Sequence, residues 1–219
     1  MTHRLGLGGA EPAREGAPGR AAELQAALGE RIRAAMAAGV DWVQVREKDL
    51  EGRELLQVAR AAVQAAVGGG ARVIVNDRLD VAVAAGAAGV HLGRESLAVS
   101  DVAEWRRARK GPGDFWIGAS CHSAAEARAA EADGADYIFF GPVFRTPSKE
   151  KFGEPQGLGK LAEACAAVKI PVLGIGGIDA GNAAECLRAG AAGIAAIRMF
   201  QDAASERELR EAVARVKSR

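Results

Sequence analysis

Short runs of apolar residues alternate along the chain with longer, alanine-rich stretches. Each run is continuous and lacks alternating polar positions, which is typical of parallel strands that are buried on both faces. The predicted strands cover residues 42–45, 73–75, 90–92, 115–118, 137–140, 172–175 and 193–197, with a weaker candidate at residues 4–7. The pattern therefore predicts an α/β protein with a parallel sheet.

The stretches between these runs carry helix signals. One apolar helix face is formed by Leu55, Ala59, Ala62 and Ala66. Ser123 followed by Glu126 forms a capping box, which predicts a helix from there to about residue 133. Asp179 is the predicted N-cap of the helix that carries Leu187. Helices and strands therefore alternate along the chain.

A glycine that suits the end of a helix precedes every second predicted strand. These glycines are Gly39, Gly86, Gly134 and Gly190, at intervals of 47, 48 and 56 residues. Each interval accommodates two strand–helix units, so the series predicts a single TIM (β/α)8 barrel with a weak or missing first strand. The longer last interval predicts an insertion at residues 146–159. A doubly wound open sheet is the alternative architecture.

Composition separates a tail from the barrel. Residues 1–20 are rich in glycine, proline and charge and predict a flexible N-terminal tail, while residues 21–219 predict the barrel domain. Lysine and arginine total 29 and aspartate and glutamate 28, so the net charge of +1 gives no reason to expect a nucleic-acid partner. No apolar run reaches the roughly 18 residues of a membrane span. We expect a soluble, cytoplasmic protein without a membrane partner.

Cysteine use agrees with that location. Cys121, Cys165 and Cys186 form no CxxC motif and have no paired histidine ligands. They predict reduced thiols and neither a disulfide framework nor a zinc site. The alanine-rich outer helices are also compatible with a homo-oligomer.

Polar residues gather where the predicted strands end, which is where the loops of a TIM barrel carry function. The candidates in chain order are Gln44, Arg46, Lys48, Asn76, Asp77, Ser96, Ser120, His122, Thr146, Ser148, Lys149, Gly176, Gly177 and Arg198. The Gly176-Gly177 turn predicts a phosphate site, because glycine lets backbone N–H groups approach an anion closely. A tight turn without a ligand is the alternative.

The charged candidates indicate a second anionic group. Arg46, Lys48 and Lys149 supply positive charge, although each alone is also compatible with a solvated surface position. Asp77 offers a carboxylate to Mg²⁺ against a diphosphate. Cys121 and His122 are neighbours in a strand, so their side chains are predicted to diverge, which argues against a Cys–His nucleophile.

Six motifs occur in one order along the chain. They are QVREK at residues 44–48, ND at 76–77, GVHLG at 89–93, FGPVF at 140–144, TPSK at 146–149 and GIGGI at 174–178. Together they resemble the thiamine-phosphate synthase/TenI family over residues from about 39 to 200. This resemblance implies a TIM barrel of thiamine biosynthesis whose substrates are small phosphate and diphosphate compounds.

The synthase branch of the family is a transferase that joins hydroxymethylpyrimidine diphosphate to hydroxyethylthiazole phosphate and releases diphosphate. The resemblance implies that Asp77 binds Mg²⁺ and that Arg46 and Lys149 assist the departure of diphosphate. It also implies that the pyrimidine diphosphate is held by Gln44, Arg46, Lys48, Asn76, Ser120 and Lys149. The resemblance further implies that the thiazole phosphate is bound by Thr146, Ser148, Gly176 and Gly177.

Three positions depart from the synthase pattern. Ser96 stands where a second magnesium-binding aspartate is usual, Ser148 replaces a threonine, and Arg198 replaces a serine near the phosphate. These changes favour, as an alternative, the TenI branch, which includes a metal-independent thiazole tautomerase with His122 as its acid/base group. A non-catalytic binder or regulator of thiamine precursors is the third hypothesis.

Overall fold

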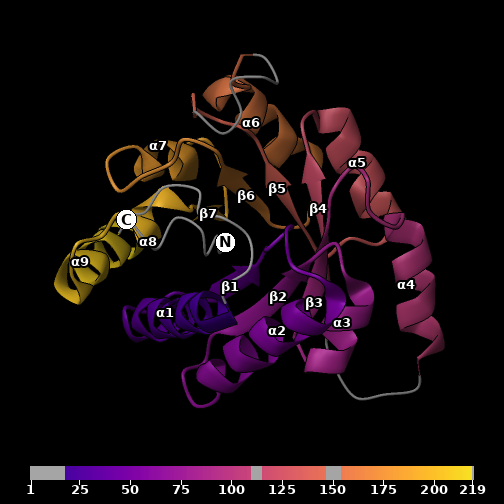
Figure 1. Ribbon diagram of the computed structural model, residues 1–219. Helices are drawn as coiled ribbons and strands as arrows, with labels where there is room; N and C mark the ends of the chain where they lie inside the picture. Colours follow the sequence, from indigo (N-terminus) through magenta and orange to yellow (C-terminus); the bar gives the residue numbers. More distant parts are fainter. Residues whose placement is uncertain (1–17, 110–114, 147–153, 219) are drawn as a thin grey trace.

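The computed structural model describes residues 18–109, 115–146 and 154–218. Within them a curled sheet of parallel strands follows the order of the chain, each strand pairing with its neighbours in sequence (Figure 1). The strands are β1 (Trp42–Val45), β2 (Arg72–Asn76), β3 (Gly89–Leu92), β4 (Trp116–Cys121), β5 (Tyr137–Phe140), β6 (Val172–Ile175) and β7 (Gly193–Ala195). The sequential order confirms the predicted barrel topology and rejects the doubly wound sheet, in which the strand order reverses.

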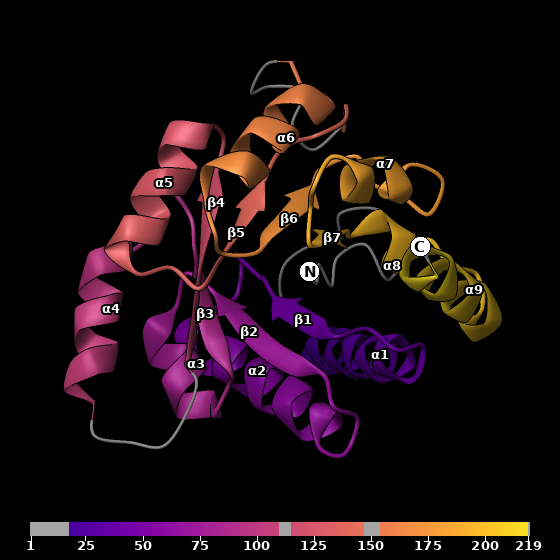
Figure 2. The same cartoon turned by 180° about the vertical axis from the view of Figure 1, so that it is seen from behind.

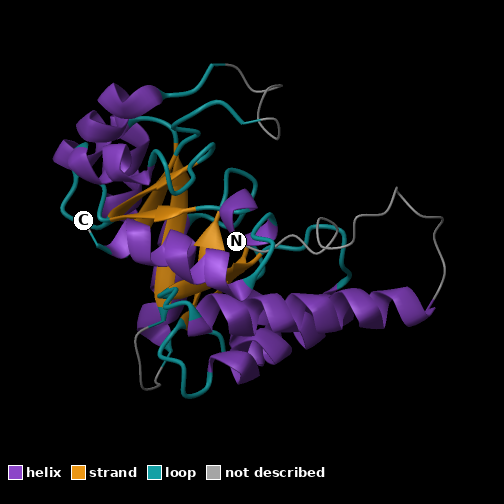
Figure 3. Ribbon diagram, turned by 90° about the vertical axis from the view of Figure 1, so that its left-hand side faces the viewer, coloured by secondary structure: helices purple, strands orange, loops and turns teal. Residues whose placement is uncertain are grey.

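Helices cover the convex face of this sheet, as the views from the two sides show (Figures 1 and 2). They are α1 (Pro18–Ala37), α2 (Gly52–Ala66), α3 (Leu79–Ala85), α4 (Val99–Ala108), α5 (Ala124–Asp133), α6 (Gly157–Ala167), α7 (Ala183–Arg188), α8 (Arg198–Gln201) and α9 (Glu206–Lys217). Seen from the side, the sheet lies inside this helical layer (Figure 3). No helix of the described residues is long and apolar enough to cross a membrane.

The helical layer continues between the two ends of the sheet. Among the described residues β1 and β7 form the sheet edges, and the predicted strand at residues 4–7 lies outside the described part. Outside these edges Ala35 of α1 packs with Leu209 and Val213 of α9. The Arg31 guanidinium donates to the carbonyl oxygens of Gln201 and Ala203 at 2.9 and 3.1 Å. Contacts between α1 and the α8–α9 region thus bring the two ends of the helical layer together.

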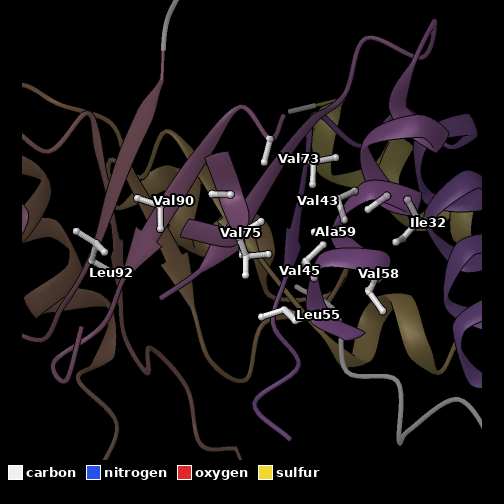
Figure 4. Close-up of a cluster of buried hydrophobic side chains, with 14 of the residues drawn as sticks. Ile32, Val43, Val45, Leu55, Val58, Ala59, Val73, Val75, Val90 and Leu92 are labelled. Carbon is white, nitrogen blue, oxygen red and sulfur yellow. The ribbon is translucent and has the colours of Figure 1, made fainter. Parts of the chain in front are cut away.

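Alternate residues of each strand point to opposite faces of the sheet, and both faces are buried. The outward side chains of β1, β2 and β3 pack beneath α1, α2, α3 and α4 in an apolar cluster (Figure 4). Its members include Ile32, Val43, Val45, Leu55, Val58, Ala59, Val73, Val75, Val90 and Leu92. This two-sided burial explains why the strands appear in the sequence as continuous apolar runs.

The inward side chains fill the interior of the barrel with aromatic and imidazole rings. The Trp42 ring packs edge-on against Trp116 and Tyr137, with centroids 5.2 and 4.6 Å apart. The His91 ring lies 4.3 Å from that of Phe139. These five rings form a packed interior beneath the carboxyl ends of the strands.

Helix ends match the sequence in most places. The four predicted helix-ending glycines all have positive φ, and Ser123 Oγ accepts a hydrogen bond from the N–H of Glu126 at 3.1 Å. The predicted cap of α7 is wrong: this helix begins after Asn182, and Asp179 Oδ1 instead accepts from the N–H groups of Gly181 and Asn182 in the preceding turn. α1 begins at Pro18, so residues 18–20, which the prediction assigns to the tail, are helical, and residues 1–17 lie outside the described part.

Candidate active site

The ends of β1 and β2 carry a chain of polar side chains. Gln44 Nε2 donates to Asn76 Oδ1 at 2.8 Å, and Asn76 Nδ2 donates to Asp77 Oδ2 at 2.6 Å. Gln44 is buried, and among the described side chains its Oε1 is the one buried polar atom without a hydrogen-bond partner. A buried polar atom without a partner is unfavourable, so this oxygen is available to a donor on a ligand.

Ser96 extends this chain to the loop after β3. Its Oγ donates to Asp77 Oδ1 and accepts the N–H of Gly93 at 2.7 Å. Asp77 has a φ of 62°, and its N–H donates to the carbonyl oxygen of His91 at 2.9 Å. The backbone therefore holds the Asp77 carboxylate toward Ser96, while Arg94 and Glu95 are exposed. Gln44, Asn76, Asp77 and Ser96, which we call the acidic chain, link three strand ends.

The oxygen atoms of the acidic chain suit a Mg²⁺ ion that is bound jointly by the protein and by a substrate. Carboxylate and hydroxyl oxygens are the hard donors that Mg²⁺ prefers, and Mg²⁺ in phosphate sites commonly uses one or two carboxylates plus substrate oxygens. Within the described ranges no group of three or more His, Cys, Asp or Glu side chains could hold a metal ion. The protein side of such a site is thus one carboxylate and one hydroxyl.

Basic residues follow the acidic chain on β1. Arg46 is half-buried just beyond the strand and Lys48 is exposed. The charge of Arg46 contributes to lowering the pKa of His91, which places Arg46 within electrostatic reach of the barrel interior. The two predicted cations therefore follow the strand that carries Gln44. Ser148 and Lys149 lie outside the described residues.

Ser120 is linked to a buried hydrogen-bond network. His91 Nε2 lies 2.9 Å from Ser120 Oγ, and His91 Nδ1 lies 3.2 Å from Tyr137 Oη. Burial lowers the pKa of His91 to about 3, with the Asp77 charge opposing and the Arg46 charge adding to the effect. Burial also raises the pKa of Tyr137 above its ordinary value. His91 is accordingly a neutral core residue, as its place in the third apolar run indicates.

Cys121 and His122 point to different surroundings, as predicted. Cys121 is buried in the helix-facing core, where burial raises the pKa of its thiol to about 12. His122 is exposed, and its Nδ1 hydrogen-bonds to the carbonyl oxygen of Gly141. Since a carbonyl oxygen only accepts, Nδ1 carries a proton and Nε2 is left to exchange one. The geometry rejects a Cys–His nucleophile and leaves His122 able to act as an acid or base.

The Gly176-Gly177 turn after β6 packs tightly against the segment after β5. Both glycines have positive φ, and a Cβ on Gly176 would lie 2.6 Å from Pro142 Cβ. A Cβ on Gly177 would lie 2.6 Å from the carbonyl oxygen of Arg145. Within the described chain, the N–H groups of these glycines make no hydrogen bond to a backbone carbonyl. The turn therefore needs glycine for its packing and leaves two amides for an anion.

Thr146 and Arg198 follow β5 and β7, the strands on either side of β6. Thr146 is buried at the end of the segment that covers the glycine turn. Arg198 is exposed at the start of α8, three residues after β7 ends. The structure thus brings the glycine turn together with the segment that carries Thr146, and it places Arg198 beyond the next strand.

Tyr137 is a residue of this site that the sequence analysis missed. It occupies an apolar run, where a tyrosine is indistinguishable from a core ring, and its partner His91 comes from a strand 46 residues earlier. The available signal was Gly118 on the intervening strand β4, which pairs with both His91 and Tyr137. A glycine between two large polar rings marks the space in which they meet.

Comparisons with known proteins cover this whole set of strands. The family model described as "Thiamine monophosphate synthase" matches residues 19–200. A protein of Geobacter sulfurreducens named "Putative thiamine-phosphate synthase" is 49% identical over 166 residues, 76% of this chain and 76% of that protein. The "Thiamine-phosphate synthase" of Moorella thermoacetica is 44% identical over 194 residues, 87% of this chain and 90% of its own. The solved structure of "Thiamine phosphate pyrophosphorylase from Pyrococcus furiosus" is 35% identical, with a TM-score of 0.76 and 87% of each chain covered.

Proposed function

Because this chain belongs to the thiamine monophosphate synthase family, we propose that it is a transferase of thiamine biosynthesis. It couples hydroxymethylpyrimidine diphosphate with hydroxyethylthiazole phosphate and releases diphosphate. The acidic chain favours this assignment over a tautomerase or a non-catalytic binder. In it, hydrogen bonds join Gln44, Asn76, Asp77 and Ser96 across three strand ends. These side chains serve a diphosphate-bearing substrate and have no evident use in a proton shift at the thiazole.

The pyrimidine diphosphate binds over β1 and β2. Gln44 and Asn76 present polar groups to the pyrimidine side, while Arg46, Lys48 and Lys149 neutralise the diphosphate. Magnesium would be held by Asp77 and Ser96 together with substrate oxygens, and its charge would favour diphosphate as a leaving group. The C–O bond to the pyrimidine methylene breaks with both electrons going to diphosphate, and the ring stabilises the resulting cation.

The thiazole phosphate binds at the other side of the barrel mouth. The amides of Gly176 and Gly177 receive its phosphate with the hydroxyls of Thr146 and Ser148, and Arg198 adds charge. Anchoring the phosphate holds the thiazole nitrogen toward the methylene cation, which the nitrogen lone pair then captures. Two anion sites on one barrel mouth thus bring the reacting atoms together.

A direct assay tests this function. The protein is incubated with both substrates and Mg²⁺, and thiamine phosphate and diphosphate are quantified by chromatography. We expect both products in equal amounts, and Asp77→Asn to lower kcat/KM by about a hundredfold, because it removes the single carboxylate of the acidic chain. The matched control is Asp80→Asn, an exposed carboxylate three residues away that pairs with Arg78. Absence of product at high enzyme concentration would refute the synthase assignment.

His122 supports a second candidate, a TenI-type thiazole tautomerase. Its Nδ1 is engaged with Gly141, so its Nε2 can shuttle a proton at the mouth of the barrel. This activity would survive a chelator and be abolished by His122→Ala, as followed by the absorbance of the aromatised thiazole. Calorimetric binding of either substrate without turnover would instead identify a thiamine-precursor binder. The homo-oligomer and the cytoplasmic location stay predictions.

A further inference from the structure

Ser120 ends a line of three polar side chains that begins deep inside the barrel. Tyr137 Oη meets His91 Nδ1 at 3.2 Å, and His91 Nε2 meets Ser120 Oγ at 2.9 Å. Tyr137 and His91 are fully buried, whereas Ser120 is exposed. The line therefore leads from the closed interior to the side of the barrel where substrates bind.

The sheet is shaped to admit this line. Gly118 pairs with His91 on one side and with Tyr137 on the other. A Cβ at Gly118 would overlap the phenol of Tyr137 and come within 2.6 Å of His91 Nδ1. The hydrogen bond between the two rings thus occupies the space of the missing side chain. Phe139 packs on the imidazole at 4.3 Å and fixes its plane.

The direction of the hydrogen bonds follows from what each group can do. In the described part of the chain, His91 Nδ1 is the hydrogen-bond partner of Tyr137 Oη. If Nδ1 carried the imidazole proton, the buried Tyr137 hydroxyl would have no acceptor, which is costly. The phenol therefore donates to Nδ1, the neutral imidazole carries its proton on Nε2, and Nε2 donates to Ser120 Oγ.

We propose that Tyr137 and His91 are positioning residues that make Ser120 a hydrogen-bond donor. With one lone pair of Ser120 Oγ occupied by His91, the hydroxyl proton is directed to an acceptor on the ligand. Under the proposed function, on which this part rests, that ligand is the pyrimidine diphosphate. If His91 carried its proton on Nδ1, the Ser120 hydroxyl would donate its hydrogen bond to His91 Nε2 and would offer only lone pairs to the substrate.

Nitrogen NMR tests the tautomer without reference to activity. The chain has three histidines, so ¹⁵N-histidine labelling gives few signals, and His91→Gln identifies those of His91. We expect the proton of His91 on Nε2 and an unprotonated Nδ1 in the wild-type protein. In Tyr137→Phe we expect the His91 nitrogen shifts to move toward the Nδ1-protonated form. An Nδ1–H signal assigned to His91 in the wild type, or His91 nitrogen shifts unchanged in Tyr137→Phe, would overturn the proposal.

Steady-state kinetics tests the consequence. We expect Tyr137→Phe to lower kcat/KM for the pyrimidine diphosphate about tenfold, and to have no further effect in a Ser120→Ala background, since both act through one hydroxyl. Trp42→Phe, which alters a ring packed on Tyr137 but takes no part in the hydrogen bonds of the line, is the control and should leave kcat/KM unchanged. Additive losses would overturn the coupling, with thermal melting confirming that each variant is folded. If the wild type makes no thiamine phosphate, the proposed function fails while the NMR experiment still decides the tautomer.

Discussion

Ser96 shows how one residue sets the charge of a site. It faces Asp77 across a direct hydrogen bond, where the synthase pattern has a second carboxylate. A serine there stabilises the Asp77 carboxylate by donating to it, whereas a second carboxylate would repel it until a cation binds. We therefore expect the serine to make the site more stable without metal and to weaken its binding of a metal ion.

Replacing Ser96 with aspartate should reverse this balance. We expect Ser96→Asp to lower the half-saturating Mg²⁺ concentration by about tenfold, since it adds a carboxylate to the donor set. Without Mg²⁺ the variant should melt at a lower temperature than the wild type, and Mg²⁺ should restore it. Mg²⁺ titrations of activity and of melting temperature check both effects. The control Ser96→Ala removes the hydrogen bond without adding charge, and equal Mg²⁺ responses in the two variants would contradict the argument.

His91 makes stability depend on pH. Burial lowers its pKa from 6.5 to about 3, with Asp77 opposing and Arg46 assisting. Between these values the unfolded chain binds a proton that the folded chain does not, so the free energy of unfolding decreases as pH falls. The expected contribution is about 1.4 kcal/mol per pH unit in that window. Urea unfolding of the wild type and of His91→Gln at several pH values measures it, and equal slopes for the two proteins would contradict it.

At the residue scale the sequence predicts which groups gather at the strand ends, but not how they pair. The motifs predict Gln44, Asn76 and Asp77 as neighbours because adjacent parallel strands end at one edge. The contact of Ser96 with Asp77 depends on the turn after β3 and on the φ of 62° at Asp77, which no local pattern encodes. Tyr137 was missed because a buried tyrosine and a core ring share one sequence signal.

At the scale of elements, the glycine turn after β6 is both a loop and a packing surface. Gly177 has a φ of 66°, and a Cβ there would press on Phe144 and Arg145. The turn therefore fixes the position of the segment that leads to Thr146. Its sequence predicts a phosphate site or a tight turn, and the structure shows that the tight turn is present in either case.

Gly177→Ala should damage both stability and substrate binding. We expect a loss of about 3 kcal/mol or more, from left-handed strain together with steric overlap, and at least a tenfold rise in KM for the thiazole phosphate, because the segment must move. The matched control is Gly39→Ala, whose φ of 93° imposes the strain but whose Cβ meets nothing within 4 Å. That variant should lose about 1–2 kcal/mol and keep its KM. Denaturant melts and initial rates compare the two, and an unchanged KM in Gly177→Ala would contradict the argument.

Strands and helix-ending glycines were predictable because their signals are local. A continuous apolar run indicates a strand that is buried on both faces. Glycine is favoured at a helix end with left-handed backbone because it adopts a positive φ without steric strain. The start of α7 was predicted wrongly because Asp179 and Asn182 both suit a cap, and tertiary packing of the preceding turn selects between them. Boundaries therefore depend on contacts that the sequence does not display.

At the scale of the whole molecule, α1 and α9 hold the ends of the helical layer together. Leu209 is buried among Ala35 and Val213, and no local signal links these distant segments. We expect Leu209→Ala to reduce the free energy of unfolding by about 2–4 kcal/mol, because it leaves a cavity at this contact. Arg207→Ala, on the exposed face of α9, should cost about 0.5 kcal/mol or less. Urea unfolding measures both, and equal losses would show that α9 packing does not contribute.

The same contact sets an order of events during synthesis. Arg31 of α1 can form its hydrogen bond to the Gln201 carbonyl oxygen only after Gln201, 170 residues later in the chain, has been synthesised. At bacterial or eukaryotic elongation rates this separation corresponds to roughly 10 to 30 seconds. Through that interval the apolar face of α1 that later meets α9 has no native partner there. Because exposed apolar surface makes partly folded chains dependent on chaperones, we expect the nascent chain to be most sensitive to slow or interrupted translation before α9 has left the ribosome.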